Sequence, residues 1–132
     1  MTSGRHLELG KMAEALAAEH VKRLGWQILS RNFSCKLGEL DIVAIDEAQK
    51  ELVIVEVRYR TFGDMQSPAD SIGPKKLRTL VNAGRVYVNN IEWTGPWRVD
   101  LVGVTAQRSE PPERWHLEHI ENITDGAFAL HV

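Results

Sequence analysis

The stretch GELDIVAIDEAQKELVIVEVRYR, residues 38–60, decides the fold of this chain. It contains two runs rich in Val and Ile, residues 38–46 and 52–60, and both alternating faces of each run are apolar. Such runs are typical of strands buried inside a sheet. The polar residues 47–50 between them have the length of a hairpin loop. We therefore predict two antiparallel strands that lie side by side in the centre of a sheet.

The length of this loop sets which residues of the two strands face each other. If the loop closes with Asp46 opposite Glu51, then Asp41 lies opposite Glu56. Opposed side chains on antiparallel strands have Cβ atoms roughly 5 Å apart, so two carboxylates there repel each other unless a cation binds both. Hard divalent ions need only one or two protein carboxylates, because water and phosphate oxygens complete their shell. The sequence thus predicts a site for Mg²⁺, or Mn²⁺, at Asp41 and Glu56.

A purely structural network is the alternative for this pair, with Glu56 neutralised by a basic side chain such as Arg31 or Arg98. We favour the metal because two carboxylates in apolar central strands are costly to bury without a specific reason. On a later strand, Arg98 and Asp100 share a face, and they either buttress the site or simply pair with each other.

Helix and strand patterns surround the hairpin. Residues 9–24 repeat apolar side chains at helical spacing, with Gly25 placed to end the helix, and a second helix follows Pro74, which suits a first helical position. Further strands are predicted at residues 26–33, at residues 97–104 and, as a short edge strand, from residue 114. Residues 61–73 lack periodicity and should form a mobile connection. The order α-β-β-β-α-β, with an additional edge strand, indicates an α/β domain with a central mixed sheet flanked by helices.

Composition supports one soluble domain over residues 1–132, since 43% of the residues are hydrophobic and 26% are charged. The lone Cys35 cannot form an internal disulfide and fits a reducing compartment. No apolar run approaches the ~18 residues of a membrane span. We therefore expect a cytoplasmic protein without membrane association.

Charge is unevenly distributed, although the formal net charge is only -2. Residues 22–36 carry four basic and no acidic side chains, and residues 58–85 carry six basic against two acidic ones. Residues 110–125 reverse this balance, with five acidic side chains against one basic. One face of the protein could therefore meet phosphates while the whole protein stays mildly acidic.

Several side chains are candidates to act beside the carboxylate pair. Arg58 shares a strand face with Glu56 and can stabilise charge on phosphate, but arginine stays protonated and cannot act as a base; its alternative is a structural partner for the carboxylates. Glu14 edges the apolar face of the first helix and could be an outer metal ligand, or an ordinary glutamate paired with Lys11. Basic side chains open the second helix, where the helix dipole does not favour cations, so they contact phosphate or form a solvated basic face: Lys75, Lys76 and Arg78.

Other chemistries find little support. His116 and His119 fall on opposite faces of a strand, which does not suit a shared metal site, and both are expected on the surface. The sequence contains no nucleophile elbow, phosphate-binding loop or dinucleotide fingerprint.

Several motifs recur in the order found in a known family. They are the run of residues 10–14, RNF at 31–33, GELDIVAID, IVEVRYR, Lys75 with Arg78, and RVDLV at 98–102. Together they resemble the YraN family of small bacterial proteins over nearly the whole chain. That family looks like a branch of the restriction-endonuclease-like PD-(D/E)XK superfamily, similar to archaeal Holliday junction resolvases.

The resemblance implies roles for individual residues. Asp41 and Glu56 would be the acidic metal ligands, the backbone carbonyl of Val57 would complete the metal shell, and Glu14 would be the helix glutamate. Arg58 stands at the usual lysine position, so a second metal ion, another side chain or the substrate phosphate would have to supply the base. The side chains that we expect to contact nucleic acid are Arg31, Lys75, Lys76 and Arg78.

Three functions follow in order of preference. The first is a Mg²⁺-dependent nuclease that hydrolyses phosphodiester bonds in DNA, including branched or structured DNA. The second is a catalytically inactive nucleic-acid-binding module of the same fold, for which Arg58 marks lost catalysis. The third is a protein-interaction scaffold. A homodimer would suit a symmetric branched substrate, but no stretch of the sequence identifies its interface.

Overall fold

The computed structural model describes residues 2–64 and 66–124, with side chains from residue 8 onward. The helices and strands follow one another as α1 (Thr2–Arg23), β1 (Gln27–Cys35), β2 (Gly38–Asp46), β3 (Glu51–Thr61), α2 (Pro74–Asn90), β4 (Trp97–Ala106) and β5 (His116–Ile120). Two short 3-10 helices, η1 (Ala69–Ser71) and η2 (Pro112–Arg114), lie in the connections. The predicted order of elements, including the additional edge strand, is confirmed.

The sheet has the strand order β1-β2-β3-β4-β5. Only the pairing of β3 with β4 is parallel among the described strands, because α2 carries the chain across between them, and the other neighbours are antiparallel. The predicted hairpin register is confirmed where β2 and β3 pair, with Asp46 opposite Glu51 and Val43 opposite Ile54. The result is the mixed sheet and flanking helices of a restriction-endonuclease-like core.

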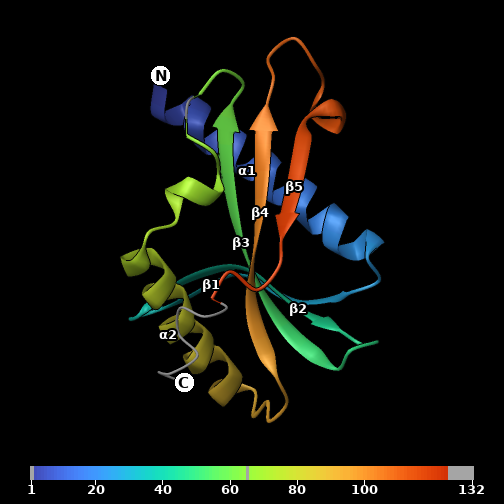
Figure 1. Cartoon of the computed structure of the whole chain (residues 1–132), viewed down its shortest axis with the longest axis vertical. Helices are drawn as coiled ribbons and strands as arrows, with labels where there is room; N and C mark the ends of the chain where they lie inside the picture. Colours follow the sequence, from blue (N-terminus) through green and yellow to red (C-terminus); the bar gives the residue numbers. More distant parts are fainter. Residues whose placement is uncertain (1, 65, 125–132) are drawn as a thin grey trace.

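The two helices cover opposite faces of the sheet (Figure 1). On the α1 face, the buried helix side chains are small, so the helix can lie close to valines of β3 such as Val53 and Val55. On the α2 face, Leu80 and Val81 pack with Leu52 and Ile54. Because side chains alternate along a strand, Glu56 falls on the α2 face and Val57 on the α1 face. The sheet therefore presents the Glu56 carboxyl group toward α2.

The first helix differs from its prediction at both ends. It begins at Thr2 rather than near residue 9, and it ends at Arg23. Leu24 was predicted to lie on its apolar face, but its side chain follows the last helical residue and is 47% exposed. Gly25 accounts for this end, since its φ of 87° lies in the left-handed region that glycine adopts without a Cβ clash.

Among the described residues, no helix is long and apolar enough to cross a membrane.

The connection between β3 and α2 contains a short helix that its composition did not predict. It contains η1, and Pro68 is buried against β4. A Cβ added to Gly103 would lie 2.5 Å from Pro68 Cβ, so only glycine permits this close approach. Gly103 pairs with Arg58 in the sheet. The connection is thereby held on the sheet beside the residues that follow Glu56.

Candidate metal and phosphate site

Asp41 lies where the pairing of β2 with β3 ends. The last paired residues are Ile42 and Val55, so the ladder stops just before Asp41 and Glu56, the two residues that the same register would next bring opposite each other. The Asp41 side chain replaces the missing backbone acceptor, since Val57 N donates to Asp41 Oδ2 at 2.8 Å. The N–H and C=O of one strand residue point to the same side. The Val57 carbonyl is therefore directed toward the same edge as Asp41.

Glu56 is the buried member of the pair. It is only 4% exposed, and the carboxyl group of Asp41 interacts with it. Burial raises the pKa of Glu56 to about 8, the Asp41 carboxylate raises it as well, and the nearby cations Lys76 and Arg58 lower it. At neutral pH and without a metal, the two carboxyl groups can thus share a proton in place of a cation.

Two basic side chains reach the same oxygen of Glu56. Arg58 Nε lies 3.2 Å from Glu56 Oε2, and Lys76 Nζ lies 3.7 Å from it. The geometry at Arg58 is that of a charge contact only, since among the described residues Arg58 Nε is a buried polar atom without a hydrogen bond. An ion pair that served only to stabilise the fold would be expected to give the Arg58 Nε donor an acceptor. The cluster therefore leaves one buried donor without an acceptor.

Glu14 approaches the pair from α1. Burial raises the pKa of Glu14, the Asp41 and Glu39 carboxylates raise it further, and Arg31 with a hydrogen bond from Asn32 lowers it, with a raised pKa as the net result. Within the described part of the chain, Glu14 makes no ion pair with Lys11, the partner considered from sequence. Glu14 thus belongs electrostatically to the Asp41 site.

The donor set suits a hard divalent ion. Asp41 and Glu56 offer carboxylate oxygens, and Val57 offers a carbonyl directed toward the same edge. Among residues 8–64 and 66–124, no three His, Cys, Asp or Glu side chains lie close enough together to hold one ion. Glu14 would therefore act through an outer shell, and water would fill the remaining positions, which is the usual arrangement for Mg²⁺.

Comparison with known proteins identifies the family. Residues 13–104 match the model of "Uncharacterised protein family UPF0102". The UPF0102 protein of Mycobacterium avium (strain 104) is 36% identical over 121 residues, which are 90% of this chain and 94% of that protein. The chain belongs to the UPF0102 family. This confirms the resemblance drawn from the motifs, because YraN is the same family.

The similarity extends beyond one genus. The UPF0102 protein of Mycolicibacterium smegmatis is 36% identical, over 89% of this chain and 95% of that protein. The UPF0102 protein of Herpetosiphon aurantiacus is 34% identical, over 88% of this chain and 93% of that protein. Near-complete coverage of both chains shows that the family unit spans most of this sequence, including Glu14, Asp41, Glu56 and Arg58.

The predicted nucleic-acid contacts of this UPF0102 protein fall into two groups. Lys76 and Arg31 lie close to acidic residues, the former at Glu56 and the latter near Glu14. Lys75 and Arg78 are exposed on α2, and in the described part of the chain they make no ion pair. The structure thus brings Lys76 into the carboxylate cluster and leaves Lys75 and Arg78 on the adjacent surface.

Arg98 and Asp100 do not belong to the site. Arg98 donates from Nε to Asp100 Oδ1 at 2.9 Å, and Asp100 also bonds His119 Nε2 at 2.9 Å. His119 in turn contacts His20 of α1 at 2.9 Å. The idea that Arg98 neutralises Glu56 is therefore wrong, and so is the surface position predicted for His119. Asp100 pairs with Val55, which places this network on the α1 face, opposite Glu56.

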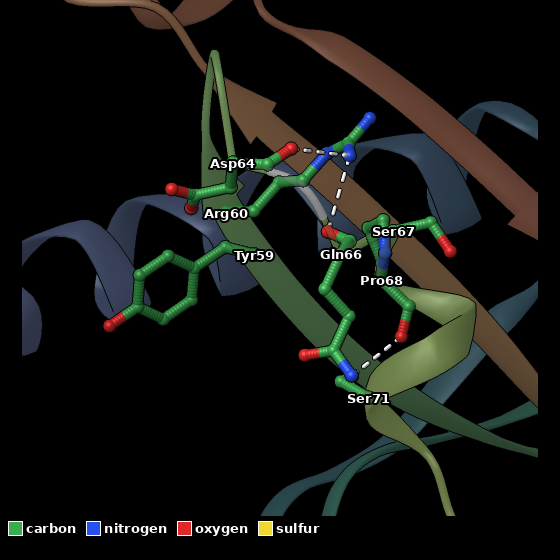
Figure 2. A pocket seen from close by; sticks show the side chains of 7 residues that line it. All are labelled: Tyr59, Arg60, Asp64, Gln66, Ser67, Pro68 and Ser71. Carbon is green, nitrogen blue, oxygen red and sulfur yellow. Dashed lines mark hydrogen bonds between the residues drawn. The ribbon is translucent and has the colours of Figure 1, made fainter.

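A pocket that the sequence did not reveal lies just beyond Arg58 on β3. It has a volume of ≈ 330 Å³, and its walls are Tyr59, Arg60, Asp64, Gln66, Ser67, Pro68 and Ser71 (Figure 2). Arg60 holds the connection in place by donating to Thr105 Oγ1 and to the carbonyls of Asp64 and Gln66. Because the walls after β3 come from an irregular connection, no periodic pattern could have indicated them.

Proposed function

We propose that this UPF0102 protein is a metal-dependent phosphodiesterase that hydrolyses DNA, including branched or structured DNA. One observation carries the proposal: Glu56 is only 4% exposed, and a second carboxyl group, that of Asp41, interacts with it. Two carboxyl groups in the centre of a sheet reduce stability unless they serve a ligand. A divalent cation is the ligand that uses both of them.

Mg²⁺ or Mn²⁺ would be held by Asp41, Glu56 and the Val57 carbonyl, and when bound it would polarise a phosphate oxygen and lower the pKa of a coordinated water. The chain's own residues would do the rest. Glu14, which is electrostatically coupled to Asp41, would orient water in the outer shell. Arg58 would hold negative charge that develops on the phosphate. The exposed cations Lys75 and Arg78 would bind the DNA backbone.

A nucleic-acid-binding module without cleavage is the second candidate, and Arg58 is the observation that favours it. The guanidinium stays protonated at all working pH values, so it cannot take a proton from water. It lies 3.2 Å from Glu56, where a lysine amine could have served as a base. In that case the cluster would bind phosphate without cutting DNA.

A cleavage screen separates these candidates. Duplex, single-stranded, flap and four-way DNA are incubated with the protein in Mg²⁺ or Mn²⁺, beside Asp41→Asn, Glu56→Gln and the matched control Glu47→Gln, whose exposed carboxylate lies in the hairpin loop. The proposal expects cleavage by the wild type and by Glu47→Gln only. Equal cleavage by Asp41→Asn would contradict it. Salt-dependent binding without cleavage in any metal would favour the binding module.

A further inference from the structure

Lys76 is the residue of α2 that enters the carboxylate cluster. Its Nζ lies 3.7 Å from Glu56 Oε2, the oxygen that Arg58 also approaches, and its side chain is 36% exposed. Glu56 is therefore contacted by one cation from its own strand and one from the helix above it. The lysine stem leaves its ammonium free to move, whereas the Arg58 guanidinium is fixed beside the strand.

Counting charges shows what Lys76 could bind. Without a metal, the positive charges of Arg58 and Lys76 balance at most the two carboxylates Asp41 and Glu56. A divalent cation on those carboxylates would take over their negative charge. Arg58 and Lys76 would then face the site without a carboxylate partner. A phosphodiester bound to the metal would supply negative charge at that place.

The start of α2 favours the same ligand. Gly73 precedes the helix without a side-chain cap, Pro74 occupies the first turn, and this turn contains no acidic residue. The helix dipole does not stabilise a lysine at the N-terminal end of a helix, so the position of Lys76 indicates another favourable interaction. The free N–H groups of an uncapped first turn attract anions as the ammonium does. Lys76 therefore belongs to a helix turn whose charge favours an anion.

We propose that Lys76 binds, from α2, a nonbridging oxygen of the phosphodiester held at the Asp41–Glu56 pair. This inference rests on the proposed phosphodiesterase function. In the substrate-free protein the Lys76 ammonium stays with Glu56. When metal and DNA bind, it turns to the phosphate and remains protonated, so no bond to Lys76 is made or broken.

The test compares Lys76→Met, which removes the charge, with Lys76→Arg, which keeps it. Lys22→Met is the matched control, because Lys22 is an exposed lysine of α1 that pairs with Glu19. Binding of four-way DNA is measured over a range of salt concentrations in EDTA and in Ca²⁺, with intact DNA verified on a gel. Cleavage is measured in Mg²⁺ at saturating DNA. Thermal unfolding checks that each variant is folded.

We expect Lys76→Met to reduce the slope of log affinity against log salt in Ca²⁺ by about 0.7 to 0.9, the effect of one lost phosphate contact. The effect in EDTA should be smaller, because there the ammonium is paired with Glu56. Cleavage should fall by about 10²-fold, as for the loss of one charge-stabilising donor. Lys76→Arg should restore most of the binding, and Lys22→Met should behave as the wild type.

The possible outcomes separate this inference from the proposed function. If the wild type cleaves DNA and Lys76→Met binds and cleaves equally well, the inference is overturned and the phosphodiesterase stands. If the wild type does not cleave but Lys76→Met loses the binding that depends on Ca²⁺, the phosphodiesterase fails and the phosphate contact stands. Equal loss in EDTA and in Ca²⁺ would mark Lys76 as an ordinary surface cation and overturn the inference. No cleavage and no effect of Lys76→Met would overturn both.

Discussion

The backbone N–H of Val57 donates to a carboxylate oxygen of Asp41 at 2.8 Å, where the ladder between β2 and β3 ends. The Asp41 side chain thus accepts a backbone hydrogen bond at the end of the ladder, and it also brings a carboxylate close to Glu56. The Asp41 carboxylate therefore has a structural role in the sheet and a proposed chemical role in the metal site. The two roles can be separated by substitutions that keep or remove the acceptor.

Asp41→Ala should be less stable than Asp41→Asn. Both variants remove the negative charge beside Glu56, but only the amide of asparagine can still accept from Val57 N. A buried donor left without an acceptor costs about 1–3 kcal/mol. Urea unfolding at pH 7 measures the difference. Equal unfolding free energies would show that the contact of Asp41 with Val57 contributes nothing to the fold.

Glu56 should make the protein less stable as the pH rises. Its folded pKa of about 8 lies above the ordinary value of 4.5, so the folded state holds a proton that the unfolded chain releases. The stabilisation is complete below the ordinary pKa and is lost as the pH rises toward the folded one, with a slope of at most ~1.4 kcal/mol per pH unit. Urea unfolding from pH 5 to 8.5 should give a flatter profile for Glu56→Gln. Parallel profiles would contradict the raised pKa.

Asp100→Asn should lower the free energy of unfolding without changing the candidate metal site. Asp100 is fully buried and accepts from Arg98, His119 and the backbone of Asn122. Breaking a buried ion pair on one side costs at most about 3–5 kcal/mol, and the cost here should be smaller, because Arg98 keeps Glu51 and Glu121 as partners. Since the network lies on the α1 face, the cleavage rate per folded molecule should not change. A rate that falls with stability held constant would place Asp100 in the site after all.

Arg58→Lys should retain most of the cleavage activity, whereas Arg58→Met should lose most of it. Lysine preserves the positive charge next to Glu56, and Arg58 Nε makes no hydrogen bond that would be lost. We expect cleavage by Arg58→Lys within about tenfold of the wild type. Arg58→Met should lose about 10²-fold, the usual effect of removing a charge-stabilising group. Rates at saturating DNA test this, and wild-type rates for Arg58→Met would exclude Arg58 from the chemistry.

The hairpin was predictable because its geometry is local. Strand alternation and the length of the loop fix the register, so the approach of Asp41 to Glu56 follows from residues 38–60 alone. Sequence could not show that the ladder stops at Ile42 and Val55, because strand alternation does not fix where two paired strands separate. The Asp41 side chain therefore bonds the neighbour of Glu56 as well, which no pattern indicated.

Contacts between distant elements were beyond the sequence. Lys76 was expected to contact phosphate. Its approach to Glu56 could not be predicted, because it depends on how α2, which connects β3 to β4, packs on the face of the sheet. His119 was expected on the surface, because its partners Asp100 and His20 lie on two other elements. Helical and strand periods assign residues to faces, and only the tertiary arrangement decides which faces meet.

Calorimetric titration with Mn²⁺ at pH 8 tests the central claim most directly, because it needs no knowledge of the DNA substrate. The wild type and Glu47→Gln should bind the ion with release of about half a proton, since the metal replaces the proton of a carboxyl group that is half protonated at pH 8. Asp41→Asn and Glu56→Gln should lose this binding. Unchanged Mn²⁺ binding in both of these variants would show that the carboxyl pair is not the metal site.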